Sequence, residues 1–469
     1  MKFIFFTADG IGLPIAYRLL KEGNDVIIAQ VQNVEDLGNG DKNEHPDIKR
    51  TRLENYNGIL TKYDAKEVLR NMKKISNKDE VFVFFDFNNL WRFAEVALKM
   101  GFTKGFFPSK EDYELEKDRN KAKDLVKKYY PGLKVADVHE FKTTDEAKQM
   151  LEESEDIWVL KGNSECAKTF VPSSKNAELA KIQIIEMLDE NTQDYESSGF
   201  ILEKMINNPR ELTPESIWWD GKLVATNIDI ENKPLGSGNI ADQTGCSANL
   251  IIKTEIDDEI NKISFPPFVE EMAKKHKGMF VWDASLLCDE DKYFFGEFCS
   301  CRVGWDSVFS EILMSGSATN YFKSISEGKN PFIYKFGVSV RGFNIAKKDE
   351  GIDYKVIKSS MNWMQSADKN VFPYEMMMED GKVTNIGASP DMVVFAGSGN
   401  EIEDALDEVY ETIENFSFED MYTRPRFDFT SYDYPSSIMN RFMYGLDRSL
   451  YSSEKTEEIN ELESLEETK

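Results

Sequence analysis

The beginning of the chain has the pattern of a strand, a glycine-containing turn, a helix and a second strand. Residues 2–6 are an apolar run typical of a buried parallel strand, and the following turn contains Gly10 and Gly12. We expect a helix over 14–22 and the next strand over 26–29. A dinucleotide site would need a third glycine and a later acid. We therefore favour a tight turn in an open α/β domain that binds no dinucleotide.

The chain is long enough for several cores, with 469 residues of which 41% are hydrophobic. A second apolar strand over 81–85 and a helix over 90–100 complete an open parallel domain in residues 1–110. Later segments mix helices with antiparallel strands, so the expected fold class is α/β and α+β multidomain. The tail over 452–469 is rich in Glu, Ser and Lys, and we expect it to be disordered.

Four local patterns in the middle of the chain predict helices and paired strands. Residues 111–130 read as one charged helix, and a second helix is expected to bury Leu179, Ile182, Ile185 and Leu188 on one face. Residues 217–230 read as a hairpin, and 279–287 with 293–298 as paired antiparallel strands.

Composition excludes several classes of function. Acidic residues outnumber basic ones, 84 to 57, and the net charge of -27 disfavours a long nucleic acid or an anionic membrane surface. The five cysteines are few and odd in number, which indicates a reducing compartment, and no signal peptide or membrane-spanning run is visible. We expect a cytoplasmic protein. The three histidines are far apart in sequence, so a histidine-based triad or metal site is excluded.

Two acids are placed to hold a metal ion. Asp283 is expected to end one apolar strand and Glu297 the next, with a polar turn between them. Such a hairpin can bring two carboxylates together in a buried sheet, where a cation such as Mg²⁺ would offset their repulsion. On spacing alone, two exposed strand-end acids are an equal alternative.

Lys161 is a candidate phosphate-binding residue. It ends the apolar strand 157–161, and a polar loop over 162–169 that contains Lys168 follows it. A strand-end lysine and loop N–H groups can hold a triphosphate, although this is not the P-loop pattern. The alternative is a lysine that extends from the strand end into solvent.

The order of these motifs resembles the ATP-grasp superfamily. The residues that carry the resemblance run in the order Glu116–Arg119, Val159–Gly162, Ile201–Met205, Asp283 and Glu297–Arg302. The resemblance implies that Arg119, Lys161 and Lys168 bind ATP. The strand residues Glu203, Lys204 and Met205 would run beside the adenine and form hydrogen bonds with it. Glu211, or Glu215 as the alternative, would bind the ribose. It further implies Asp283 and Glu297 as ligands of Mg²⁺, with Mn²⁺ as an alternative, and Arg302 as the residue that steadies the transferred phosphoryl group.

Over roughly 1–430 the chain is similar to the phosphoribosylamine–glycine ligase family. The segments 228–233, 242–245, 386–394 and 422–428 carry this likeness. It implies a pre-ATP-grasp domain over 1–110, an ATP-grasp domain over 111–325, a C-terminal ligase-type domain over 326–430 and an extension over 431–469. Three departures surround the acceptor pocket. Cys246 replaces a glycine, Trp305–Asp306 replaces Asp-Pro-Glu, and Tyr374–Met378 occupies the region of a His-Ala-Gly-Thr motif that has no counterpart here. At the metal site, Cys299 replaces an asparagine ligand.

The resemblance implies an ATP-dependent carboxylate–amine ligase that forms an acyl phosphate and releases ADP and phosphate. Its partners would be a small carboxylate and a small amine, and the protein would be a monomer or a homodimer. Because the acceptor motifs differ, we expect a substrate other than that of the family. Two alternatives stay open, namely a genuine phosphoribosylamine–glycine ligase and an ATP-binding protein without catalysis.

Overall fold

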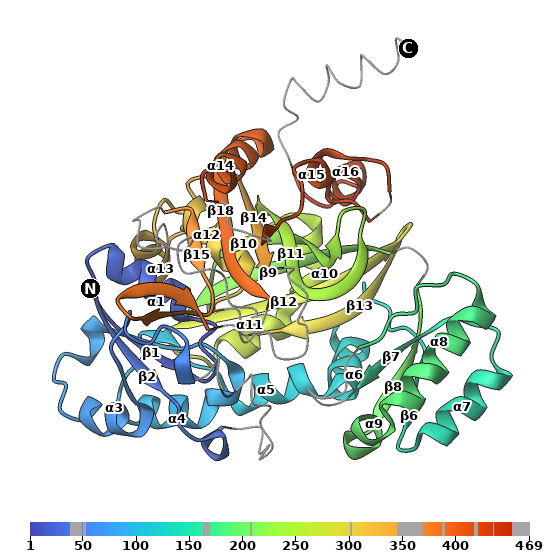
Figure 1. The fold of residues 1–469 in the computed structure, drawn as a ribbon, viewed down its shortest axis with the longest axis horizontal. Coiled ribbons are helices and arrows are strands. Elements are labelled where there is room, and N and C mark those ends of the chain that lie inside the picture. The colour runs from blue at the N-terminus through green and yellow to red at the C-terminus, as the bar shows by residue number, and fades with distance from the viewer. Residues whose placement is uncertain are drawn as a thin grey trace, which may run out of the picture. The chain divides into compact units, whose positions relative to one another are not determined.

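The computed structural model describes residues 1–37, 49, 53–162, 169–206, 209–300, 303–344, 369–386, 390–416, 421–434 and 436–452. The chain forms two compact units, the first made of 1–110, 212–283 and 299–469 and the second of 111–211 and 284–298. Mixed sheets and helices in these units confirm the expected α/β multidomain class (Figure 1). The four-segment division stays a prediction. Among the described residues, no helix has both the length and the apolar character needed to cross a membrane.

The first unit is built on a large mixed sheet with the strand order β15-β18-β14-β11-β10-β9-β12-β5-β4-β1-β2-β3. Its β1 pairs in parallel with both β2 and β4, whereas β9, β10, β11, β14 and β18 pair antiparallel. The strands are β1 (Lys2–Thr7), β2 (Asp25–Gln30), β3 (Lys62–Asp64), β4 (Val81–Phe85), β5 (Gly105–Phe106), β9 (Arg210–Trp219), β10 (Lys222–Gly236), β11 (Ile240–Thr254), β12 (Met279–Asp289), β14 (Phe336–Asn344), β15 (Val371–Pro373), β18 (Asp391–Gly399) and β19 (Met421–Tyr422), with the separate pair β16 (Met376–Glu379) and β17 (Lys382–Asn385).

The helices of the first unit are α1 (Leu13–Lys21), α3 (Ala65–Met72), α4 (Trp91–Lys99), α10 (Glu259–Ser264), α11 (Pro267–Ala273), α12 (Asp306–Met314), α13 (Ala318–Ser326), α14 (Ile402–Asn415), α15 (Phe427–Thr430) and α16 (Ile438–Asp447). Phe6 and Phe85 lie in the hydrophobic core between β1, β4 and α4, and their rings stack at 4.7 Å. The expected strand, glycine turn, helix and strand at the beginning of the chain are confirmed. Because β1 and β4 are parallel neighbours, the loops after them lie at the same edge of the sheet.

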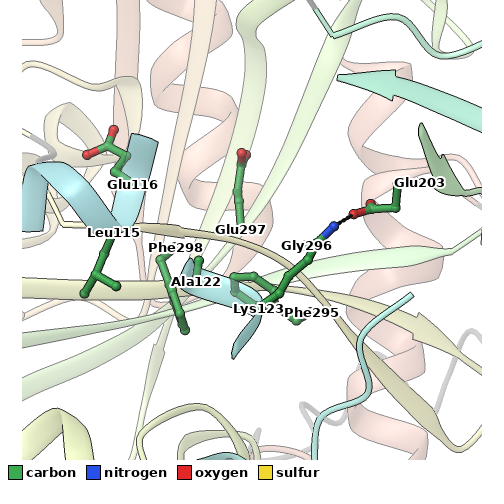
Figure 2. Close-up of a pocket in the computed structure, with 9 residues that line it drawn as sticks. All are labelled: Leu115, Glu116, Ala122, Lys123, Glu203, Phe295, Gly296, Glu297 and Phe298. Atoms are coloured by element: carbon green, nitrogen blue, oxygen red, sulfur yellow. Dashed lines mark hydrogen bonds and ion pairs between the residues drawn. The ribbon is translucent and has the colours of Figure 1, made fainter. Parts of the chain in front are cut away.

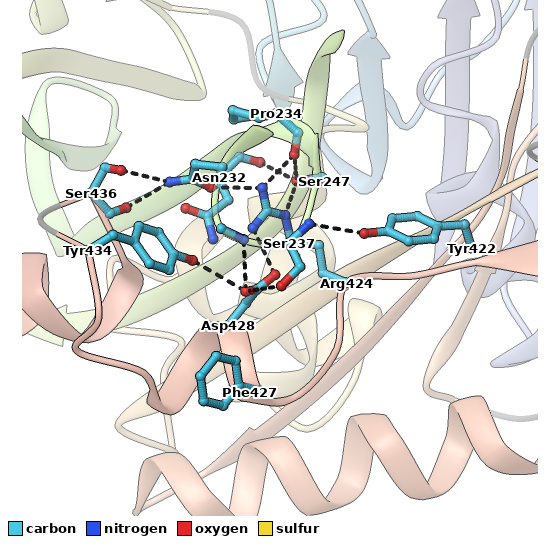
Figure 3. A network of polar contacts seen from close by, with 12 residues as sticks. Asn232, Pro234, Ser237, Ser247, Tyr422, Arg424, Phe427, Asp428, Tyr434 and Ser436 are labelled. Carbon is cyan, nitrogen blue, oxygen red and sulfur yellow. Dashed lines mark hydrogen bonds and ion pairs between the residues drawn. The ribbon is translucent and has the colours of Figure 1, made fainter. Parts of the chain in front are cut away.

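A buried ion pair within the first unit links the segment that contains α15 to the β10–β11 hairpin. Arg424 and Asp428 are both 0% exposed and pair at 2.8 Å. Arg424 also donates to the Ser247 hydroxyl at 2.9 Å and to the carbonyl of Pro234 at 2.6 Å, both in the β10–β11 hairpin (Figure 3). A fully hydrogen-bonded pair of this kind fixes the hairpin against α15, the helix that carries Asp428.

The second unit contains the small antiparallel sheet β6-β8-β7, with α7 and α8 along one side of it (Figure 1). Its strands are β6 (Val138–Phe141), β7 (Trp158–Gly162), β8 (Phe200–Lys204) and β13 (Lys292–Cys299), which pairs with β12. Its helices are α5 (Lys110–Lys117), α6 (Arg119–Tyr129), α7 (Thr144–Glu153), α8 (Ala177–Glu190) and α9 (Thr192–Ser198). Leu160 and Leu202 from the sheet pack with Leu151 and Ile184 from the helices to form the core.

The single helix expected over 111–130 is two helices. It breaks at Asp118, whose carboxylate caps α6 by accepting the N–H of Lys121 at 3.0 Å. An aspartate stabilises a helix start in this way, and that capping signal outweighs the charged pattern that suggested one continuous helix.

The buried face of α8 also differs from expectation. The structure buries Ala180, Ile184 and Leu188, whereas Leu179 and Ile182 are 56% and 51% exposed. Apolar residues lie on several sides of α8, so its sequence did not identify the side that packs on the sheet.

The strands that carry the two candidate metal acids are longer than expected. β12 continues to Asp289, so Asp283 lies inside it, and Glu297 lies inside β13, which ends at Cys299. The prediction that both acids end their strands is wrong. The residues after Asp283 continue the buried pattern, with Ala284, Leu286 and Cys288 each 0% exposed, which prolongs the strand.

Candidate functional site

Lys161, predicted to bind phosphate, lies beside Glu203 on the sheet of the second unit. Lys161 on β7 pairs in register with Ile201 on β8, two residues before Glu203. Paired residues in a sheet share a face, and residues two apart on one strand do too, so both side chains lie on the same face. The Lys161 ammonium donates to Glu203 Oε1 at 2.5 Å.

A second lysine, Lys123 of α6, binds the other oxygen of the same carboxylate. Lys123 Nζ contacts Glu203 Oε2, and the side chains of Lys123 and Glu203 are only 4% and 5% exposed. Burial raises the pKa of Glu203, but Lys161 and Lys123 together lower it further, and the net pKa lies below its ordinary value. Glu203 is therefore ionised at neutral pH. Two lysines around one carboxylate leave a net positive charge.

A pocket opens beside this ion cluster. It lies between α5 and α6 on one side and β13 and β8 on the other, and Figure 2 shows Lys123 reaching Glu203 at its edge. Two acidic residues, Glu116 and Glu297, also line it. The full lining is Leu115, Glu116, Ala122, Lys123, Glu203, Phe295, Gly296, Glu297 and Phe298. Apolar rings beside a cationic cluster suit a ligand with a flat apolar part and an anionic part.

The segment predicted to pass the adenine makes several hydrogen bonds within the protein. The N–H groups of Lys204 and Met205 donate to the carbonyls of Asp137 and Ile157, each at 2.8 Å. The Lys204 ammonium pairs with Asp156 at 2.8 Å. An adenine contact from this segment would therefore use its carbonyl groups or a neighbouring N–H.

The predicted ribose acid, Glu211, and its reserve, Glu215, lie in different surroundings. Glu211 accepts a hydrogen bond from the Ser285 hydroxyl at 2.6 Å within the second unit. Glu215, in the first unit, is only 1% exposed. Glu211 is thus the better placed of the two to meet a hydroxyl-bearing ligand in the second unit.

The predicted metal acids belong to different units. Asp283 in the first unit is 3% exposed, and Glu297 in the second lines the pocket. Over the described ranges, no group of three or more His, Cys, Asp or Glu could hold a metal by itself. Mg²⁺ in nucleotide sites is commonly held by one or two carboxylates together with substrate phosphates, so oxygen donors such as these fit it.

Three predicted residues fall outside what the structure describes. Lys168 and Arg302 lie outside the described residues, and Arg119 begins α6 but its side chain is not described. Their roles stay predictions.

The segments predicted to border the acceptor meet at one place in the first unit. Arg341 of β14 donates from Nε to Asp306 at 3.1 Å and from Nη1 to Asp391 at 2.9 Å. The Arg341 guanidinium also lies 5.1 Å from the centre of the Tyr374 ring. Burial raises the pKa of the Cys246 thiol, and the charges of Glu231 and Asp306 raise it further, so the thiol stays protonated. We call Arg341, Asp306, Asp391, Tyr374 and Cys246 the Arg341 cluster.

Sequence reasoning missed Lys123 and Arg341. Lys123 sits next to Ala122 on the buried face of α6, and a lysine on a buried helix face is a signal that could have been used. Arg341 likewise interrupts a strand of buried residues. In both cases the partner is far away in sequence, so only the fold identifies it.

Comparisons with known proteins identify the fold. No protein-family model matches the chain, and no curated protein sequence matches it. The structure of phosphoribosylamine–glycine ligase from Thermotoga maritima matches with a TM-score of 0.59 and 16% identity, covering 90% of this chain and 99% of that one. The biotin carboxylase domain of 2-oxoglutarate carboxylase from Hydrogenobacter thermophilus, solved with MgADP and bicarbonate, matches with a TM-score of 0.55 and 12% identity, over 97% and 99% of the two chains. The structure of an ATP complex of biotin carboxylase from Campylobacter jejuni matches with a TM-score of 0.54 and 14% identity, covering 96% of this chain and 97% of that one.

These neighbours are ATP-grasp enzymes, so this chain has the ATP-grasp fold, as the order of its motifs predicted. Within that fold, the likeness to phosphoribosylamine–glycine ligase extends over nine-tenths of the chain and spans both compact units.

Proposed function

We propose that this protein is an ATP-dependent ligase that joins a small carboxylate to a small amine through an acyl phosphate. The observation that carries the proposal is the buried Lys123–Glu203–Lys161 cluster beside a pocket, on an ATP-grasp fold. Burying two lysines around one acid is costly unless an anionic ligand makes use of the excess charge. A triphosphate is an anion of the right kind.

In the proposed reaction, the substrate carboxylate attacks the γ-phosphorus of ATP and ADP leaves. The amine then attacks the acyl carbon, loses a proton and expels phosphate, which leaves an amide. Lys161, Lys123, Arg119 and Lys168 would hold the phosphates, and Arg302 would steady the transferred group. In this mechanism no side chain acts as a nucleophile, so no histidine is needed to activate one. This agrees with a chain that has only three histidines.

The nucleotide base and the metal complete the proposed site. Glu203, Lys204 and Met205 would border the adenine, and Glu211 would bind the ribose. Asp283 and Glu297 would hold Mg²⁺, or Mn²⁺, which when bound neutralises charge on the phosphates. A cytoplasmic location and a monomeric or dimeric state belong to the same proposal.

We further propose that the substrates are not phosphoribosylamine and glycine. The altered acceptor segments support this, since Cys246, Asp306 and Tyr374 gather around Arg341 and form a buried polar cluster. Each lost polar contact to a substrate can cost about 1–3 kcal/mol of binding. Weak or no turnover with glycine is therefore expected.

The experiment is an ADP-release assay with a panel of carboxylates and amines, run beside a thermal-shift measurement with Mg-ATP. ADP release that requires both a carboxylate and an amine supports the ligase. Stabilisation by Mg-ATP without ADP release for any pair would favour an ATP-binding protein without catalysis. Efficient turnover of phosphoribosylamine with glycine would instead identify a genuine phosphoribosylamine–glycine ligase.

A further inference from the structure

The turn between β1 and α1 has the form of an anion-binding site. It follows a parallel strand and leads into a nine-residue helix, Leu13–Lys21, with Gly10 and Gly12 in the turn. Backbone N–H groups at such a helix start commonly bind a phosphate. An ATP-grasp ligase with a phosphorylated acceptor could use these groups.

In this chain a side chain of the protein already occupies that position. Asp86, the residue after β4, accepts the N–H of Ala8 on Oδ1 at 3.3 Å and the N–H of Gly12 on Oδ2 at 3.1 Å. Asp86 is 1% exposed. It reaches the turn because β4 and β1 are parallel neighbours, so both loops begin at the same sheet edge.

Two further N–H groups of the turn, those of Gly10 and Ile11, are also engaged. The N–H of Gly10 donates to the Thr7 hydroxyl at 2.9 Å, and that of Ile11 donates to Asp9 at 3.2 Å. The packing is close as well, since a Cβ on Gly12 would lie 2.7 Å from the Asp86 Cβ. A phosphate would have to displace Asp86 to reach the N–H groups of Ala8 and Gly12.

The electrostatic surroundings of the turn also disfavour a bound phosphate. Burial raises the pKa of Asp86 to about 8, and the neighbouring Asp9 contributes to the rise. A raised pKa means that the surroundings of the turn disfavour negative charge, so they disfavour a phosphate dianion as well. A neutral or cationic group with hydrogen-bond donors would meet favourable partners there.

The turn adjoins the Arg341 cluster. A Cβ on Gly304 would lie 2.1 Å from the carbonyl oxygen of Ile11, so the backbones of the turn and of residue 304 are in contact. The Tyr374 hydroxyl donates to the carbonyl of Gly304 at 2.5 Å, and Tyr374 belongs to the cluster. The turn and the altered acceptor segments therefore form one continuous region of the first unit.

We propose that Asp86 is a specificity-determining residue, which fills the anion position of the β1–α1 turn so that the acceptor bound beside it carries no phosphate there. The group that replaces the phosphate would be neutral or cationic, such as an amine or a hydroxyl. The identity of this region as the acceptor site rests on the proposed function. The position of Asp86 in the turn is independent of that function, because it follows from the hydrogen bonds to Ala8 and Gly12.

The test is a titration of the full chain with inorganic phosphate, followed by NMR of protein labelled with ¹⁵N at alanine and glycine. In the wild type, the amide signals of Ala8 and Gly12 should not shift. In Asp86→Ser, which removes the carboxyl group and leaves the turn, both signals should shift and saturate. Asp86→Asn is the matched control, because it keeps the shape of the side chain and one of its two acceptor oxygens, so it still fills the turn and should stay unresponsive to phosphate.

Saturable shifts of Ala8 and Gly12 in the wild type would overturn the proposal, whether or not the serine variant folds. A folded Asp86→Ser variant that stays unresponsive would overturn it too. Because the titration needs neither ATP nor turnover, its outcome is separate from that of the ligase assay. A negative ligase assay with the expected shifts would contradict the proposed function alone.

Discussion

Replacing Lys123 with methionine removes one of the two cations that neutralise the buried Glu203 carboxylate. The side chains of Lys123, Glu203 and Lys161 are 4%, 5% and 12% exposed, so water screens the cluster little. Removing one partner of a buried pair typically costs about 3–5 kcal/mol, and because Lys161 remains, we expect a loss of about 2–3 kcal/mol in the free energy of unfolding. Methionine keeps the length and apolar character of the stem, so little packing is lost.

The control for this substitution is Lys121→Met on the same helix. Lys121 is 43% exposed and pairs with Glu114 at 2.8 Å, and an exposed pair of this kind is worth less than about 1 kcal/mol. Both variants lose one positive charge from the same element. The measurement is urea unfolding of the full chain at pH 7, followed by circular dichroism.

The pH dependence provides a second check. Glu203 has a lowered pKa, so its contribution to stability is present above its unfolded value of 4.5 and is lost as pH falls through the folded value. The difference in the free energy of unfolding between Lys123→Met and the wild type should therefore shrink as the pH is lowered below 4.5. Equal stability of Lys123→Met and Lys121→Met at pH 7 would refute the reasoning, as would a difference that does not change with pH.

Three further predictions concern Lys161, Cys299 and Asp86. Lys161→Ala should abolish Mg-ATP binding in calorimetry, whereas Lys127→Ala, at a 64% exposed site, should bind like the wild type; unchanged affinity in the first variant would remove Lys161 from the site. Cys299→Asn should keep or raise ligase activity, because an amide oxygen is a better Mg²⁺ ligand than a thiol, and a folded variant without activity would mean that the thiol has a role of its own. Asp86→Asn should flatten the pH dependence of stability. The pKa of Asp86 is raised from 3.8 to about 8, so in the wild type its contribution falls as pH rises across that interval; equal slopes in thermal unfolding would contradict this.

Patterns that depend on neighbours in sequence were predicted correctly. The β1–α1–β2 opening and the hairpin around Asp220–Gly221 match the structure, since Asp220 and Gly221 adopt the positive φ angles, 46° and 77°, that a tight hairpin turn uses. The strand predicted over 157–161 is β7, Trp158–Gly162, so the prediction was correct to within one residue at each end and Lys161 is the residue before the last. These features follow from local periodicity and from the conformational preferences of single residues.

Features that depend on tertiary contacts were not predicted. The sequence did not connect Lys123 with Glu203, because α6 and β8 meet only in the folded unit. It also assigned Leu179 and Ile182 to the buried face of α8, since the sheet selects one of several apolar sides. Asp86 was not noticed at all, because its partners Ala8 and Gly12 are reached only through the parallel pairing of β1 with β4.

The central claim is that a carboxylate attacks the γ-phosphorus of ATP, and ¹⁸O transfer tests this most directly. The protein would be incubated with Mg-ATP, an amine panel and carboxylates labelled with ¹⁸O, and the released phosphate analysed by mass spectrometry. We predict ADP as the nucleotide product and one ¹⁸O atom in the phosphate, with a carboxylate that supports turnover. Release of unlabelled phosphate during amide formation, or of AMP and pyrophosphate, would contradict the acyl-phosphate mechanism.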